Sequence, residues 1–447
     1  MKCIHLLGSL LAGITCAACS EGMDPAQLEN HFLRHLQGEE SPFASEYKVA
    51  KEEIADCRQV VWSAWQQANS RFEEDKLPVL SPLSEKKDFK WPLPEALEPH
   101  AVMPFYYGTK GEKPESGWPM FLYIHGSGDK EHEWSASYSY ANKFEDAPSV
   151  YFIPQIPNTG KYYRWWQKAK LFAWERLIRL SFADGEFDPN RFYMIGISEG
   201  GYGSQRLASF YADYLAAVGP MAGGEPAVQA PPENCGHIGF SLRTGAEDVM
   251  FERERLVREA KLAFDSLEQQ YPGEYRHFID VIPGRGHHID YLPTPPWVRQ
   301  FVRRLHPKHF IWIDYALDGQ FRKGFYNLGI DERASDEVDL RTRYDVCIKE
   351  NVVDLQVQKV VYEATYREPK WDIPITFEKH YSVAEKGGVT VFLNEDLVDF
   401  DKEVTVTVNG KVLFKGMVSP SLEAMVNSCA CFFDPERVYP VAIDVKW

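Results

Sequence analysis

The strongest constraint on the fold of this chain is the motif Gly-Ile-Ser-Glu-Gly-Gly at residues 196–201. It directly follows the expected strand 191–195 and opens the expected helix 201–211. A serine at a tight turn between strand and helix adopts strained backbone angles, and glycines two positions before and after it prevent collisions. The spacing predicts a strand, a sharp turn that presents Ser198, and a helix. The alternative is a glycine-rich turn whose serine is incidental.

Strands and helices alternate on both sides of this motif. Short apolar runs predict buried strands, and longer amphipathic runs predict helices. Such alternation is typical of an α/β fold with a mostly parallel sheet covered on both faces. The expected strands are 121–124, 150–153, 191–195, 216–218, 238–242 and 278–282, and the expected helices are 164–182, 201–211 and 252–270.

The first 19 residues have the pattern of a targeting signal: Lys2, an apolar run over 4–14, and small residues after it. The run is too short to span a bilayer. Residues 16–19 (Cys-Ala-Ala-Cys) resemble a lipoprotein cleavage site, which implies lipid attachment at Cys19 and an exported protein of the cell envelope, periplasmic or at the cell surface. Cys16 departs from the usual leucine, so ordinary cleavage near Ala18 is the alternative.

Three further regions follow. Residues 20–89 predict a helical appendage and a proline-rich linker, and 90–306 contain the α/β pattern. Residues 307–447 predict a β-rich domain, because 404–414 form two alternating strands about Asn409-Gly410, a strong hairpin signal. A short helix is expected at 421–431.

Charge and composition exclude several functions. The 447 residues carry 49 Lys and Arg against 65 Asp and Glu, a formal charge of -16 that opposes binding to nucleic acid. Membrane association is expected only through the lipid at Cys19. His287, His288 and Asp290 lie close in sequence, but their spacing matches no helical metal-ligand pair. We therefore expect neither a metal nor another cofactor.

The order of polar residues after Ser198 resembles the α/β-hydrolase superfamily, in which an acid and then a histidine follow the nucleophile. The resemblance covers roughly residues 90–306 and maps the acid onto Asp248 and the base onto His287. Both residues follow expected strands, at the sheet edge where such folds build their sites. Glu247 is the alternative acid and His288 the alternative base.

The resemblance also implies roles. His287 would take the proton of Ser198 as the hydroxyl attacks a carbonyl, while Asp248 orients the imidazole. The oxyanion would be held by the N–H of Glu199 and by one from the segment His-Gly-Ser-Gly at 125–128, with Gly126 and Ser127 as candidates. The carboxylate of Glu199 must then point away from the oxyanion.

Candidate substrate-binding residues lie before the motif and beside the base. Trp165 and Trp166 offer flat platforms for sugar rings, and Arg164 can pair with a carboxylate. The alternative is that the two tryptophans begin a helix and one packs into the core. Arg285 is a second candidate carboxylate ligand, or a solvated loop residue.

As a whole, the chain resembles exported carbohydrate esterases of glycan-degrading Gram-negative bacteria, most of all the pectin methylesterase-like members of carbohydrate esterase family 19. This resemblance implies a serine esterase that removes methyl or acetyl groups from plant polysaccharide, with a carbohydrate ester as its partner. The alternatives are a serine peptidase of the prolyl oligopeptidase type, although only about 90 residues precede the hydrolase pattern, and a non-catalytic glycan-binding lipoprotein.

Overall fold

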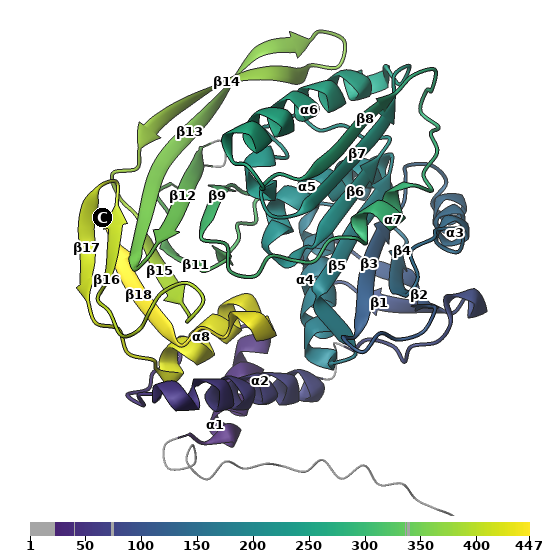
Figure 1. The fold of residues 1–447 in the computed structure, drawn as a ribbon. Helices are drawn as coiled ribbons and strands as arrows, with labels where there is room; N and C mark the ends of the chain where they lie inside the picture. Colours follow the sequence, from purple (N-terminus) through teal and green to yellow (C-terminus); the bar gives the residue numbers. More distant parts are fainter. Residues whose placement is uncertain (1–22, 40, 73–75, 336, 338–339) are drawn as a thin grey trace, which may run out of the picture.

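The computed structural model describes residues 23–39, 41–72, 76–335, 337 and 340–447, and the signal expected over residues 1–19, with Cys19, lies outside them. Figure 1 shows a central sheet flanked by helices, a β-rich region beside it, and N-terminal helices below. Within the described residues no helix is both long and apolar enough to cross a bilayer.

The central sheet has eight strands in the order β1-β2-β4-β3-β5-β6-β7-β8. β1 and β2 pair antiparallel to each other, β2 pairs antiparallel to β4, and every later pairing is parallel. This is the sheet of an α/β-hydrolase. The strands are β1 Asp88–Pro92, β2 Val102–Lys110, β3 Trp118–Ile124, β4 Ser149–Pro154, β5 Phe187–Ile197, β6 Ala217–Met221, β7 Gly239–Gly245 and β8 His277–Ile282.

Helices cover both faces of this sheet. Side chains of β3 alternate: Met120 and Leu122 belong to the buried cluster that includes residues of α4, α5 and α6, whereas Phe121 and Tyr123 belong to the one that includes residues of α3 and α7. Because both faces of the central sheet are buried, strands such as β3 consist of continuous runs of apolar residues. The helices are α3 Lys130–Ala141, α4 Lys168–Asp184, α5 Glu199–Tyr211, α6 Arg253–Gln270 and α7 Thr294–Val298.

Two sequence expectations in this region need correction. The sheet begins at Asp88, inside the predicted linker, and β2 was not expected; both strands lie at the antiparallel edge and contain prolines. The helix expected from Arg164 begins at Lys168, because Gln167 is extended and the Asp318 carboxylate accepts a hydrogen bond from the Lys168 N–H at 2.8 Å. Residues 164–167 therefore form a loop beside the sheet.

The C-terminal region contains two sheets. One has the order β10-β11-β15-β18 and the other the order β17-β16-β13-β12-β9, with β14 paired to β13. Asn409 and Gly410 turn between β16 and β17 with φ of 50° and 78°, as the hairpin signal predicted. The elements are β9 His309–Asp314, β10 Gly324–Phe325, β11 Leu328–Glu332, β12 Arg341–Lys349, β13 Val352–Glu368, β14 Ile373–Val383, β15 Gly388–Leu393, β16 Val404–Val408, β17 Lys411–Gly416, α8 Leu422–Phe432 and β18 Val441–Lys446.

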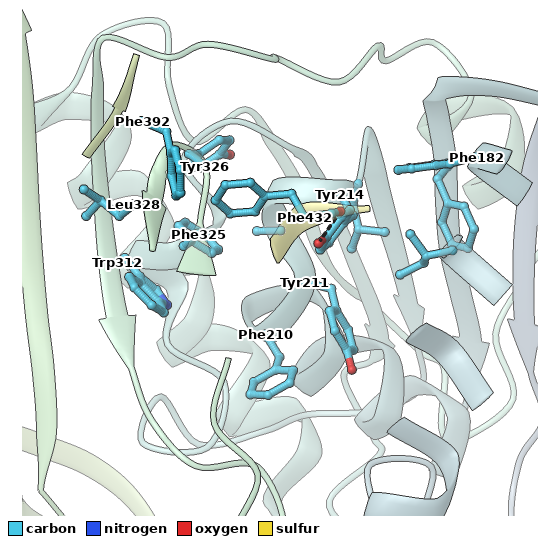
Figure 2. Packing of buried hydrophobic residues seen from close by; sticks show 14 of the residues in the cluster. Phe182, Phe210, Tyr211, Tyr214, Trp312, Phe325, Tyr326, Leu328, Phe392 and Phe432 are labelled. Carbon is cyan, nitrogen blue, oxygen red and sulfur yellow. Dashed lines mark hydrogen bonds between the residues drawn. The ribbon is translucent and has the colours of Figure 1, made fainter. Parts of the chain in front are cut away.

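An aromatic cluster joins the C-terminal region to the hydrolase sheet (Figure 2). Tyr214, just after α5, donates its O–H to the carbonyl of Phe432 at 2.9 Å. Trp312 of β9 stacks on Phe325 of β10 at 5.3 Å between ring centroids. The two regions therefore share one continuous buried core.

Five buried charges lie at the same junction. Asp213 accepts two hydrogen bonds from Arg322, each 3.0 Å long, and one from Arg437 at 2.6 Å. Asp434 accepts bonds from Arg303 at 2.6 and 3.1 Å and from Arg437 at 2.7 Å. Arg437 thus bridges two carboxylates that come from the two regions.

The N-terminal helices α1 Pro25–Leu36 and α2 Ile54–Arg71 pack against each other and against α8 of the C-terminal region, and α2 also packs against α4. Arg58 of α2 pairs with both carboxylate oxygens of Glu395, at 3.1 and 2.5 Å. The extended segment before α2 exchanges two hydrogen bonds between Phe43 and Asn427. Part of the region predicted as helical is therefore extended chain.

Candidate active site

Ser198 stands at the turn between β5 and α5, with φ 57° and ψ -114°. This left-handed conformation is strained for a residue with a side chain. The turn is held because the Ser198 N–H donates to the carbonyl of Met221 at 2.9 Å. A Cβ at Gly196 would lie 2.1 Å from the carbonyl oxygen of Gly200, and one at Gly200 would lie 2.1 Å from that of Ile124. Both glycines are thus required by close backbone approach.

The structure brings the three predicted triad residues together. The Oγ of Ser198 lies 3.0 Å from Nε2 of His287, and Nδ1 of His287 lies 2.7 Å from Oδ2 of Asp248. Because an ionised carboxylate only accepts hydrogen bonds, Nδ1 carries the hydrogen and Nε2 accepts from the serine hydroxyl. This is the geometry of an activated nucleophile.

Asp248 is buried, with 2 % of its side chain exposed, and Arg253 donates to its Oδ1 at 2.8 Å. Burial alone would raise the pKa of Asp248, but the hydrogen bond from His287 and the charge of Arg253 outweigh it and lower the pKa. The carboxylate is therefore charged at neutral pH and can stabilise an imidazolium.

The alternative acid and base lie elsewhere. Glu247 and His288 are both exposed, while Asp248 is buried and His287 is partly buried with 34 % of its side chain exposed. Among the residues that the structure describes, no group of three or more His, Cys, Asp or Glu side chains is arranged to hold a metal ion.

The loop after β3 lies against Ser198, since a Cβ at Gly126 would be 3.3 Å from the Cβ of that residue. His125 fixes this loop: its Nδ1–H donates to the Gly126 carbonyl at 2.7 Å, and its Nε2 accepts from the Ile156 N–H at 3.0 Å. Burial lowers the pKa of His125 to about 4, so the ring is neutral. Ser127 lines the cavity beside Ser198.

The second expected oxyanion donor is the N–H of Glu199, the first residue of α5. The first N–H groups of a helix have no intrahelical acceptor and carry the positive end of its dipole. The side-chain carboxylate of Glu199 lies 3.3 Å from the guanidinium of Arg164. Burial raises the pKa of Glu199, and the charges of Arg164 and Arg206 oppose that rise.

A cavity of about 350 Å³ opens at Ser198. Many of the residues that line this cavity were not predicted from the sequence. Tyr202 and Arg206 lie one and two turns after Ser198 on the same face of α5, a spacing that would have identified them. The hydrolase part of the wall comprises Ser127, Arg164, Trp166, Ser198, Glu199, Tyr202, Arg206, Gly224, Glu225, Pro226, Gln229, Phe251, Arg253 and Leu256, and the C-terminal region adds Asp372, Ile373 and Pro374.

The predicted substrate-binding residues separate into two groups. Arg164 and Trp166 line the cavity, and the guanidinium of Arg206 lies 4.0 Å from the Trp166 ring centroid. The prediction that Trp165 is a platform is wrong: its ring is buried, and its N–H donates to the carbonyl of His125 at 2.8 Å. Arg285 is exposed and is not among the residues that line the cavity.

Comparison with known proteins gives structural likeness only. No family model and no curated protein sequence matches the chain. A thermostable esterase is 18 % identical with a TM-score of 0.36, over 48 % of this chain and 63 % of its own. The BES protein from Bacillus cereus is 14 % identical with a TM-score of 0.36, over 52 % of this chain and 99 % of its own.

A third likeness is to the feruloyl esterase module from Clostridium thermocellum, an S954A mutant complexed with sinapinate. It is 15 % identical with a TM-score of 0.33, over 50 % of this chain and 91 % of its own. The strand order and the turn at Ser198 are themselves those of the α/β-hydrolase fold.

Proposed function

We propose that this protein is a serine ester hydrolase that works through a covalent acyl-enzyme. The observation that carries the proposal is the continuous hydrogen-bond chain from Ser198 through His287 to Asp248. In this hydrogen-bonded chain Ser198 is the nucleophile, His287 the base and Asp248 the buried anion that stabilises the base.

The chemistry follows from these positions. The Oγ of Ser198 attacks the ester carbonyl carbon while its proton passes to Nε2 of His287. The oxyanion is stabilised by the N–H of Glu199 and by the loop of Gly126 and Ser127. The C–O bond then breaks, the alcohol leaves with the proton from Nε2, and water repeats the steps to release the acid. Asp248 stabilises the imidazolium in both halves.

For the substrate, we propose ester groups on plant polysaccharide, with methyl esters of pectin-type uronic acids first and acetyl esters second. Supporting observations are the exposed cation of Arg164 and the half-buried ring of Trp166 in the cavity wall. A guanidinium can pair with a neighbouring carboxylate, and a ring can pack against a sugar. Export with a lipid at Cys19 completes this proposal.

The other two functions fit less well. In the described residues before the hydrolase sheet, the regular structure consists of the helices α1 and α2 and short 3₁₀ turns, in the place where a prolyl oligopeptidase-type enzyme has its propeller. A glycan-binding protein without activity has no need of an aligned Ser198, His287 and Asp248.

The test is hydrolysis by the purified protein and by Ser198→Ala on 4-nitrophenyl acetate, methyl-esterified pectin, acetylated xylan and dipeptide amides. We expect Ser198→Ala to reduce kcat by roughly 10⁵-fold or more, because the covalent step is lost. Released methanol or acetate identifies the ester.

The matched control is Ser204→Ala, which changes a buried serine on the same helix whose hydroxyl donates to the Gly201 carbonyl. It should retain activity and reaction with a fluorophosphonate, whereas Ser198→Ala should lose both. Unchanged turnover in Ser198→Ala would exclude this nucleophile, and cleavage of amides alone would favour a peptidase.

A further inference from the structure

We infer that the tip of the β13–β14 hairpin, residues 367–374, is a sugar-binding subsite of the active-site cleft, with Trp371 as its stacking platform. The ligand is a pyranose ring of the polymer that bears the scissile ester. The inference rests on the proposed function in naming that polymer as substrate.

The β13–β14 hairpin extends from the C-terminal region to the hydrolase region. β13 pairs with β12 only as far as Val360, and beyond that residue it pairs with β14 alone, up to Glu368. Figure 1 shows this pair extending past the C-terminal sheet toward α6. Asp372, Ile373 and Pro374 thereby line the cavity that contains Ser198. The cleft has one wall from each region of the chain.

Trp371 is not itself a lining residue of this cavity, but it directly precedes the lining residue Asp372 and packs against another, Phe251. The ring centroid of Trp371 is 4.6 Å from that of Phe251, which lines the cavity and follows Asp248 by three residues. Even so, 43 % of Trp371 is exposed. A large ring that is seated on one neighbour and open to solvent beside a catalytic cavity suits a sugar face, which presents C–H groups to the ring.

The tip is preorganised. The carboxylate of Glu368 accepts the N–H groups of Lys370 and Trp371 at 2.9 and 2.7 Å. Arg367 donates to the carbonyl of Asp372 at 3.0 Å. Ligand binding therefore does not first have to order this turn, which reduces its entropic cost.

Polar groups surround the ring. The ammonium of the exposed Lys370 lies over the ring, 4.8 Å from its centroid, and a sugar face has to displace it to reach that side of the ring. The Asp372 carboxylate borders the cavity, with most of its side chain exposed. Cations and carboxylates next to an aromatic ring can bond the hydroxyl groups at the edge of a sugar, while the ring holds its face.

The first test compares kcat/KM of Trp371→Ala on a polymeric ester and on 4-nitrophenyl acetate. The ratio of kcat/KM for the polymer to that for the small ester should fall about tenfold, mainly through KM, because 4-nitrophenyl acetate has no sugar ring to bind the subsite. Trp371→Phe should recover most of the loss. Tyr381→Ala removes an exposed ring from β14 of the same hairpin, opposite Val360 in the register, and should leave both activities unchanged.

The second test is independent of turnover. Ser198→Ala and the double variant Ser198→Ala/Trp371→Ala are titrated calorimetrically with methyl-esterified oligogalacturonide and with acetylated xylo-oligosaccharide. At least tenfold weaker binding of either sugar by the double variant supports the subsite, even if the wild type hydrolyses no ester.

Two outcomes overturn the inference while the proposed function stands: Trp371→Ala slows the polymer and the small ester equally, or the two Ser198 variants bind both sugars alike. Absence of binding to either oligosaccharide overturns it as well. Absence of ester hydrolysis by the wild type instead defeats the proposed function alone.

Discussion

Asp248 and Glu247 are adjacent carboxylates on one loop, and their surroundings give them different chemistry. Asp248 is buried between His287 and Arg253, whereas the side chain of Glu247 is exposed. A buried carboxylate that accepts two charged or polar donors keeps its charge and its position. Such an acid can hold one tautomer of an imidazole.

Substitution separates the two residues. Asp248→Asn should lower kcat roughly 10⁴-fold, because an amide at this position favours the tautomer whose Nε2 cannot accept the Ser198 proton. Glu247→Gln makes the same change next to it and should leave kcat within about twofold. Steady-state kinetics on 4-nitrophenyl acetate measures both, and equal losses would mean that the assignment of the acid is wrong.

Ser198, His287 and Asp248 could be predicted because motif spacing and the order of residues along the sequence mark them. Ser198 is marked by flanking glycines, and Asp248 and His287 each follow a strand. The family pattern placed the acid at Asp248 and left Glu247 as the alternative. The fold decides between them, since burial and the contact with Arg253 depend on how the loop packs beside α6.

At the level of elements, the loop after β3 depends on a tryptophan from another loop. Trp165 donates to the His125 carbonyl, and Tyr163 donates its O–H to the Gly126 carbonyl at 2.9 Å. These bonds occupy the carbonyl groups of the loop and fix its backbone beside Ser198. Trp165 thus acts on the site by positioning, and Trp166 by contact with the cavity.

Substitution of Trp165 should mainly affect stability, whereas substitution of Trp166 should mainly affect substrate binding. Trp165→Phe removes a buried hydrogen bond and should lower the free energy of unfolding by roughly 1–3 kcal/mol. Trp166→Phe alters a half-buried ring and should lower it less, but should raise KM for the polymeric ester. Thermal unfolding and kinetics on both variants test this, and a larger stability loss in Trp166→Phe would contradict it.

The antiparallel end of the sheet was harder to predict than its parallel part. The strands from β3 to β8 contain runs of apolar residues, and all but the edge strand β8 are largely buried, which the sequence reveals directly. β1 at the edge and β2 beside it are antiparallel strands that contain Pro92 and Pro104, so their sequence resembles a linker. Their place in the sheet depends on pairing with β4, which no local pattern encodes.

At the level of the whole molecule, the C-terminal region contributes to the cleft as well as to the core. Asp372 lies 174 residues after Ser198 in the sequence, yet both residues line the same cavity. Contacts across such separations depend on how two regions dock. The composition and strand pattern predicted a β-rich region, but they contained no signal for its hairpin at the active site.

The docking is held by the buried charges around Arg437. Burial alone would raise the pKa of Asp434, but the guanidinium groups of Arg303 and Arg437 outweigh it and lower the pKa to about 2. The ordinary value is 3.8. Because the folded-state pKa is the lower one, the unfolded chain takes up the proton first as the pH falls, and stability is lost between about pH 4 and 2.

Denaturant unfolding from pH 7 to pH 3 should detect this contribution. The depressed pKa of Asp434 corresponds to about 2 kcal/mol of stability at neutral pH. Asp434→Asn leaves two buried arginines short of a charged partner, so it should be less stable at pH 7 by roughly 3–5 kcal/mol. It should then lose less than the wild type as the pH falls from 4 to 3. Asp401→Asn, at an exposed partner of Lys51, should keep the wild-type profile. Parallel pH profiles for Asp434→Asn and the wild type would show that this carboxylate does not link the docking of the two regions to pH.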